Sequence, residues 1–175
     1  SLSFSGAAIT ATSVGSYIIS PGGYSSNNYN FNYVNGSLLI TSKTITVTGI
    51  TAADKVYDGN TTASISTGSI DFDGLETGDN VTIVSSTGVF DTKNVGVGKT
   101  VTLTNTYGGT DVGNYTIVNQ GSTTAAITAK TVTATLTGSI TKMYDGDAVA
   151  TLTSSNYSLF GFVSGESAII TQTVG

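Results

Sequence analysis

The densest group of side chains able to do chemistry lies between residues 71 and 79, where the sequence reads Asp-Phe-Asp-Gly-Leu-Glu-Thr-Gly-Asp. Hard cations such as calcium are bound by several oxygen atoms, and a single loop can supply many of them. Asp71, Asp73 and Asp79 are the candidate ligands. Their spacing differs from that of an EF-hand loop, whose glycine and closing glutamate fall elsewhere. We therefore interpret the segment as a solvated acidic turn, with calcium binding as the alternative.

Residues 94–100 read Asn-Val-Gly-Val-Gly-Lys-Thr, which is similar to the end of a phosphate-binding loop. That motif needs a further glycine at the position of Lys93 and a helix after the threonine. Residues 101–104 instead read Val-Thr-Leu-Thr, a strand pattern. We interpret the glycines as a turn between strands and predict no nucleotide site.

The sequence Lys-x-Tyr-Asp-Gly occurs twice, at residues 55–59 and 142–146. A Lys-Tyr-Asp set could serve acid–base catalysis only inside a cleft of suitable geometry. The residue types fit a turn better, because Asp caps its own backbone, Gly takes positive φ, and Tyr buries its ring with the hydroxyl hydrogen-bonded. We therefore predict no catalytic residue, and a structural role for Tyr57, Asp58, Gly59, Tyr144, Asp145 and Gly146.

Composition removes several classes of chemistry. The chain has no Cys, His, Trp or Arg, which excludes thiolate zinc sites, histidine-dependent nucleophiles and arginine clamps. Charged residues make up 10% of the chain, the net charge is −5 and the lysines are dispersed, which argues against a nucleic-acid partner. No apolar run approaches the roughly 18 residues of a membrane helix, so we expect no membrane insertion. The 38% of apolar residues is enough for a folded core.

The two Tyr-Asp-Gly triplets are 87 residues apart, and at the same offset residues 40–46 return as residues 127–133. This period is too long for solenoid coils of roughly 20–50 residues. It suits a string of small domains, and the phase of the repeat divides the chain in the middle of a module. We predict the back half of one module in residues 1–42, a complete module in 43–129 and the front half of another in 130–175. We expect the chain to be a segment of something longer.

Strands must position these residues. Apolar or aromatic residues alternate with Thr in residues 44–48, 81–83, 101–104 and 115–117, a period of two that places the apolar set on one face. Gly and Asn or Asp clusters separate these runs. We predict an all-β fold of tandem small antiparallel modules, either sandwich, barrel or β-grasp-like, in an extended array. A short helix over residues 75–80 is the one helical alternative.

Aromatic residues alternate with Asn near the start of the chain, at Tyr24, Tyr29, Phe31 and Tyr33. Aromatic faces beside amide groups could stack on sugars. Packing in the core of the first half-module is the simpler interpretation.

In these features the chain resembles the YDG-type repeat that occurs, with related MBG-type modules, in large bacterial surface adhesins and haemagglutinin-like exoproteins. Residues 33–40 resemble the end of an MBG-type module, so that residues 1–42 are read as an MBG/YDG-like half. The YDG resemblance depends on the order and spacing of five short motifs, at residues 55–59 and 142–146, 74–79, 93–99, 114–115 and 127–130.

The resemblance implies a passive structural module of a secreted adhesin, stalk or extracellular filament that serves surface attachment or biofilm matrix formation. It brings no catalytic residues and no cofactor, and it implies an extracellular or bacterial cell-surface location. The alternative is a module that binds a glycan or a host protein. Because half-modules expose unpaired strand edges, we expect neighbouring modules or subunits of the same fibre to complete residues 1–42 and 130–175.

Overall fold

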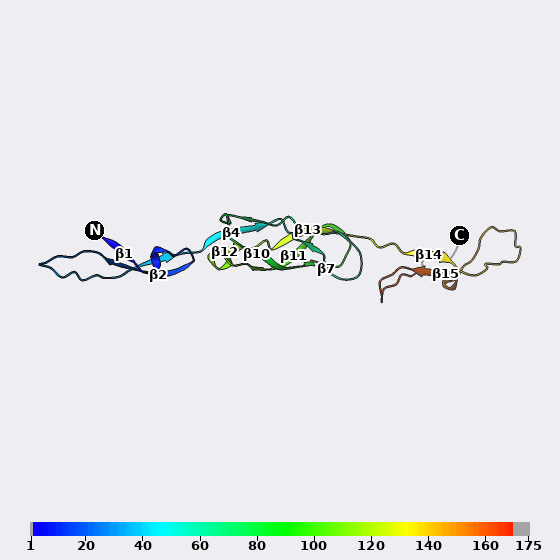
Figure 1. Cartoon of the computed structure of the whole chain (residues 1–175). Coiled ribbons are helices and arrows are strands. Elements are labelled where there is room, and N and C mark those ends of the chain that lie inside the picture. The colour runs from blue at the N-terminus through cyan, green and yellow to red at the C-terminus, as the bar shows by residue number, and fades with distance from the viewer. Residues whose placement is uncertain (1, 170–175) are drawn as a thin grey trace.

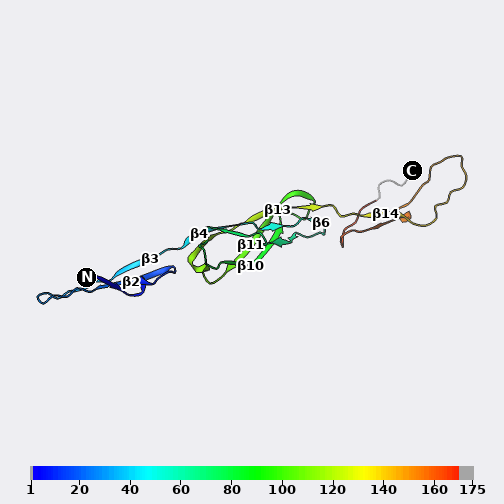
Figure 2. The ribbon, with the colours of Figure 1, turned by 45° about the horizontal axis from the view of Figure 1, so that its top comes forward.

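The computed structural model describes residues 2–169. Strands are the main regular elements of this part of the chain, together with short 3-10 turns. The molecule is elongated, with a small sheet at each end and a compact body between them (Figures 1 and 2). In the part of the chain that the structure describes, no helix is long and apolar enough to span a bilayer.

The N-terminal body is a three-stranded antiparallel sheet in the order β1-β2-β3. A long connection, residues 23–35, joins β2 to β3. None of residues 2–40 is buried, so this sheet has no core of its own. Its elements are β1 (Ser3–Ser5), the 3-10 turn η1 (Ala7–Ile9), β2 (Gly15–Gly22) and β3 (Gly36–Ile40).

The middle body contains a five-stranded sheet in the order β6-β13-β11-β10-β7 and a three-stranded sheet in the order β12-β4-β9, with β5 paired to β8. A 3-10 turn, η2 (Val112–Asn114), precedes β12. The strands are β4 (Lys43–Thr48), β5 (Thr51–Ala52), β6 (Lys55–Val56), β7 (Thr62–Ala63), β8 (Ile65–Ser66), β9 (Asp71–Asp73), β10 (Thr82–Phe90), β11 (Gly96–Gly108), β12 (Tyr115–Val118) and β13 (Ser122–Thr128).

The apolar residues of the alternating runs form the core of the middle body. Ile45 and Val47 of β4 are 0% and 1% exposed, while the threonines between them face solvent. Val101 and Leu103 of β11 alternate with threonine in the same way. The alternation therefore predicted the buried faces correctly. Each of these side chains contributes about 1.5–3 kcal/mol through burial.

Strand direction differs from the sequence prediction of antiparallel modules. Most pairs are antiparallel, but β12 runs parallel to β4 and β13 runs parallel to β6. Side chains alternate with a period of two in both kinds of pairing, so the sequence pattern carries no information on direction.

The C-terminal body repeats part of the middle body. Its strands are β14 (Thr133–Leu136) and β15 (Tyr157–Phe160), with the 3-10 turn η3 (Ser154–Asn156) between them. Thr133 pairs with Phe160, and these positions lie 87 residues after the pair Thr46 and Asp73 of β4 and β9. The neighbouring pairs keep the same offset. None of residues 128–169 is buried, so the strand pairing is repeated without a core.

The suggested helix over residues 75–80 is wrong. Two turns occupy the segment, closed by hydrogen bonds from Leu75 N to Phe72 O (3.1 Å) and from Asp79 N to Glu76 O (3.1 Å). Gly74 and Gly78 have φ of 93° and 102°, which a right-handed helix does not allow.

Candidate functional site

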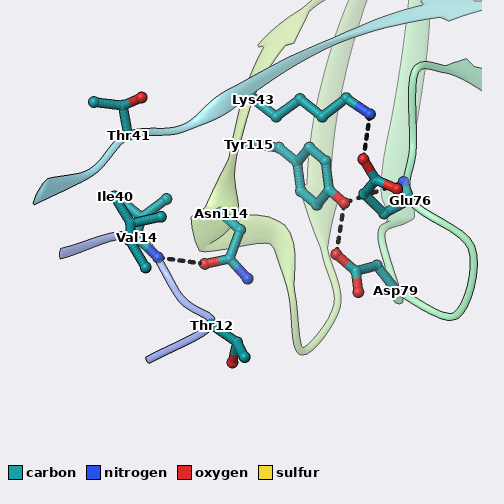
Figure 3. Close-up of a pocket in the computed structure, with 9 residues that line it drawn as sticks. All are labelled: Thr12, Val14, Ile40, Thr41, Lys43, Glu76, Asp79, Asn114 and Tyr115. Atoms are coloured by element: carbon teal, nitrogen blue, oxygen red, sulfur yellow. Dashed lines mark hydrogen bonds and ion pairs between the residues drawn. The ribbon is translucent and has the colours of Figure 1, made fainter. Parts of the chain in front are cut away.

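A pocket of about 220 Å³ lies where the N-terminal body meets the middle body (Figure 3). The N-terminal segment supplies one wall, and β4, the loop after β9 and the start of β12 supply the other. Val14 N donates a hydrogen bond of 2.9 Å to Asn114 Oδ1 across this boundary. The lining residues are Thr12, Val14, Ile40, Thr41, Lys43, Glu76, Asp79, Asn114 and Tyr115.

Tyr115 organises the polar groups of this pocket. Its ring is 9% exposed, and its hydroxyl donates to Asp79 Oδ2 (2.5 Å) and accepts from Glu76 N (3.2 Å), as Figure 3 shows. The hydrogen bond to the Asp79 carboxylate raises the pKa of Tyr115, and desolvation adds to the shift.

Beside it, Lys43 Nζ lies 2.6 Å from Glu76 Oε1. This contact raises the pKa of Lys43 and lowers that of Glu76. The polar and charged groups of the pocket thus bind one another. Their hydrogen bonds and ion pair hold the loop at residues 74–79 against β12 and β4.

Two of the three candidate calcium ligands lie on β9 and the third lies in the turn that follows it. Asp71 and Asp73 are exposed in β9 on the face opposite Phe72, which packs against the core, whereas Asp79 lies in the following turn and accepts from Tyr115. Among residues 2–169 there is no group of three His, Cys, Asp or Glu side chains placed to hold a metal ion. The structure therefore does not bring these carboxylates together.

The first Tyr-Asp-Gly turn is organised around the ammonium group of Lys55. Lys55 Nζ donates to Asp58 Oδ1 (2.8 Å), to Asn60 O (2.9 Å) and Oδ1 (3.0 Å), and to Thr62 O (3.1 Å). Asp58 Oδ1 also accepts from Asn60 N (3.1 Å), and Gly59 has φ of 82°. The lysine side chain is 17% exposed and links oxygens of one loop, the task that a bound cation performs in other proteins.

The second turn repeats three of these lysine contacts at an offset of 87 residues. Lys142 Nζ donates to Asp145 Oδ1 (2.9 Å), Asp147 O (2.6 Å) and Val149 O (2.9 Å), and Gly146 has φ of 77°. The two tyrosines differ in environment. Tyr57 packs against the core of the middle body, whereas the side chain of Tyr144 is 93% exposed.

The glycine-rich segment 94–100 forms the start of β11 and contains a β-bulge, with Gly98 at φ of 60°. Lys99 Nζ lies 2.7 Å from Asp91 Oδ1 and donates to Thr92 Oγ1 (2.7 Å). A strand follows the glycines, so the segment lacks the helix N-terminus of a phosphate-binding loop.

Three of the four aromatic residues near the start of the chain, Tyr24, Phe31 and Tyr33, form an exposed stacked row. The ring centroids of Tyr24 and Phe31 lie 5.7 Å apart, and those of Phe31 and Tyr33 lie 6.3 Å apart. Tyr33 Oη accepts from Tyr24 N (2.7 Å) and donates to Tyr24 O (3.0 Å). The prediction that these residues pack in a core is wrong for this structure, because the N-terminal sheet buries no side chain.

One long-range contact has no counterpart among the sequence predictions. The backbone N and O of the buried Ile50 lie in the connection after β4, outside a strand ladder. Gln120 Oε1 accepts from Ile50 N (2.9 Å), and Gln120 Nε2 donates to Ile50 O (2.7 Å). The amide side chain thus satisfies both backbone groups, as a neighbouring strand would.

Two family models match the chain. The YDG domain matches residues 41–126, and the MBG domain (YGX type) matches residues 1–39. No curated protein and no solved structure matches it. The YDG match covers the middle body from the residues before β4 into β13, and the MBG match covers the N-terminal sheet. The matches support the assignment of this chain as a YDG/MBG-type region, with a YDG domain preceded by MBG-type sequence.

Proposed function

We propose that this chain is a structural repeat region of a secreted bacterial adhesin, stalk or extracellular filament, which serves surface attachment or biofilm matrix formation. The observation that supports this most is the repeated register of β4–β9 and β14–β15 at an offset of 87 residues. A repeated unit placed along one axis supplies length. The proposal includes an extracellular or cell-surface location, no catalytic activity and no cofactor.

The connections of the middle body suit the transmission of tension. β4 begins directly after residues 41–42, which follow β3, and β13 ends before residues 129–132, which lead to β14. Tension along the chain pulls β4 and β13 lengthwise, toward opposite ends of the molecule. The hydrogen bonds of β4 to β12 and of β13 to β11 are then loaded together rather than broken one after another.

Single-molecule pulling of the full chain between reference domains tests the proposal. Residues 43–128 should unfold in one event with a contour-length increase of roughly 25–30 nm, since an extended residue spans about 3.3–3.6 Å. Unfolding at forces indistinguishable from those of an unstructured chain would contradict a mechanical role.

The sheets at the two ends of the molecule concern the partners that we propose for the chain. Neither residues 2–40 nor residues 130–169 bury a side chain, although both contain large apolar residues. We propose that neighbouring modules or subunits of the same fibre cover these faces. A compact, proteolysis-resistant state of both segments in an isolated monomer would contradict this.

The stacked aromatic row favours the second candidate, binding of a glycan or a host protein. At an offset of 86 residues, however, Asn28-Tyr29 matches Asn114-Tyr115, and Phe31 then matches Ile117; Tyr115 and Ile117 pack in the middle body. Phe31, the middle ring of the row, then corresponds to a position that packs in the middle body, and the structural function is favoured. Binding of the full chain to a glycan array, lost on Tyr24→Ala and Tyr33→Ala substitution, would reverse this preference.

A further inference from the structure

The loop of the C-terminal body that follows β15 has the geometry of the loop after β9. Gly161 and Gly165 have φ of 105° and 83°, and Glu166 N donates to Val163 O (3.0 Å). At an offset of 87 residues, Asp79 N donates to Glu76 O (3.1 Å). Glu166 therefore stands at the position that Asp79 occupies in the middle body.

This loop contacts the middle body. Tyr57 Oη donates to Glu166 Oε1 (2.5 Å), and Lys93 Nζ lies 3.1 Å from the same oxygen. Lys93 Nζ also lies 6.0 Å from the centre of the Tyr57 ring. A carboxylate that accepts from both a phenol and an ammonium is held more firmly than by either group alone.

Apolar contacts surround this polar group. A pocket of about 250 Å³ between the two bodies is lined by Val95 and Ala129 on one side and by Phe162 and Val163 on the other. A Cβ atom built on Gly59 would lie 2.9 Å from Val163 Cγ1. The Tyr-Asp-Gly turn thus faces the following body with a glycine, which has no side chain to clash with Val163, and with a tyrosine hydroxyl.

At the boundary between the N-terminal and middle bodies the corresponding loop also lines a pocket, although Asp79 there accepts from Tyr115 of its own body. The loop at residues 74–79 lines the pocket there with Lys43, as the loop at residues 161–166 lines the second pocket with Lys130. Lys43 and Lys130 are 87 residues apart. The same loop of a module therefore faces the preceding body at both boundaries.

We propose that the Tyr-Asp-Gly turn is a docking site for the next module, in which the Tyr57 hydroxyl and Lys93 hold the carboxylate of Glu166. This extends the proposed structural function, on which it rests, from length to the fixed orientation of successive modules. The Asp58-Gly59 turn, in which Asp58 Oδ1 accepts from Asn60 N, follows Tyr57 directly, and Glu166 is the partner residue. Tyr144, 93% exposed, marks the same surface in the next copy.

Distance distributions between two spin labels test the docking. The chain has no Cys, so Thr104→Cys on β11 and Met143→Cys on the C-terminal body allow specific labelling. We expect a narrow distribution for the parent, and at least a twofold broadening for Tyr57→Phe and for Glu166→Gln. Glu166→Asp, which shortens the side chain by one methylene, should broaden it as well.

Two matched controls separate docking from folding. Tyr144→Phe changes the equivalent tyrosine and should leave the distribution unchanged. Gly59→Ala and Gly146→Ala both place a side chain at positive φ, but only the former has Val163 within contact distance, so only Gly59→Ala should broaden the distribution. The thermal unfolding of each variant reports whether the middle body is intact.

A distribution for Tyr57→Phe as narrow as that of the parent, in a folded variant, would overturn the docking proposal. Such a result would leave the single unfolding event under force untouched, so the structural function would stand. The opposite result is also informative. If the pulling experiment failed while Tyr57→Phe and Glu166→Gln still broadened the distance distribution, the structural function would be overturned and the docking would stand.

Discussion

In the turns at residues 55–62 and 142–149 a lysine donates to an Asp side chain and to two backbone carbonyls, yet the turns lie in different surroundings. The first belongs to a body with a buried core, in which Phe90 is 2% exposed beneath Lys55. The second belongs to a sheet that buries nothing. Local geometry therefore follows from the local sequence in both copies, whereas burial depends on strands supplied from elsewhere in the chain.

The substitution with the largest expected effect removes a buried aromatic side chain from the core of the middle body. Phe90→Ala should lower the free energy of unfolding by about 3–5 kcal/mol, because it deletes a buried aromatic side chain and leaves a cavity. Chemical denaturation of the full chain measures the change. Phe160→Ala, in β15, is the control: its side chain is 59% exposed, and the change should stay within about 0.5 kcal/mol. Equal effects would show that the C-terminal sheet shares the core.

A glycine substitution tests the packing of the middle body. A Cβ on Gly88 would lie 2.5 Å from Ile65 Cδ1 and 2.9 Å from Val101 Cγ1. Gly88→Ala should therefore destabilise the middle body by about 1–3 kcal/mol through overpacking. Gly121→Ala is the control, since its Cβ would have no atom within 4 Å. A neutral Gly88→Ala in thermal unfolding would mean that the neighbouring side chains yield easily.

Removing the lysine at the centre of each turn compares the copies directly. Lys55→Met leaves Asp58, Asn60 and Thr62 without their shared donor and should cost about 1–2 kcal/mol. Lys142→Met removes the same bonds from a sheet without a core and should leave the cooperative transition unchanged. Denaturation midpoints measure both. A shift for Lys142→Met as large as that for Lys55→Met would indicate that the two copies unfold together.

The smallest expected effect is the dependence of the Glu166 docking contact on pH. The hydrogen bond from Tyr57, and then the one from Lys93, hold the pKa of Glu166 below its usual range. Because the docked state lowers the pKa of Glu166, the contact stabilises docking fully at pH values above the ordinary pKa of glutamate. This stabilisation is lost as the pH falls through the lowered pKa of Glu166. Label distances should therefore broaden in acid, below about pH 4. The charged groups that face Glu166 from the middle body and the linker include Lys93 and Lys130.

The matched control for the pH series is Glu166→Gln, whose distribution should be broad at every pH. A parent distribution that narrows in acid would reverse the sign of the effect and contradict the contact. Circular dichroism over the same range shows whether the middle body stays folded.

Part of this structure was predictable from local patterns. The alternation in residues 44–48 and 101–104 predicted the buried residues of β4 and β11, and the register of β14 with β15 follows that of β4 with β9 at the 87-residue offset of the sequence. For the acidic segment at residues 71–79 the sequence left calcium binding as the alternative to a solvated turn, and it could not indicate that Asp79 accepts a hydrogen bond from Tyr115 while Asp71 and Asp73 lie exposed in β9. The aromatic row misled, since its predicted core needs strands that the N-terminal sheet does not contain.

By itself the sequence determined the strand faces, the Asp-Gly turns and the 87-residue offset, because each depends on residues near one another or on identity at a fixed spacing. Only the tertiary structure decided the parallel pairing of β12 with β4, the partner of Asp79 and the partner of Tyr57. The hydrogen bond between Tyr115 and Asp79 joins residues 36 positions apart, and the one between Tyr57 and Glu166 joins residues 109 positions apart. The physical reason is that a tyrosine hydroxyl or a strand edge can pair with many partners, and only packing of the whole module selects one.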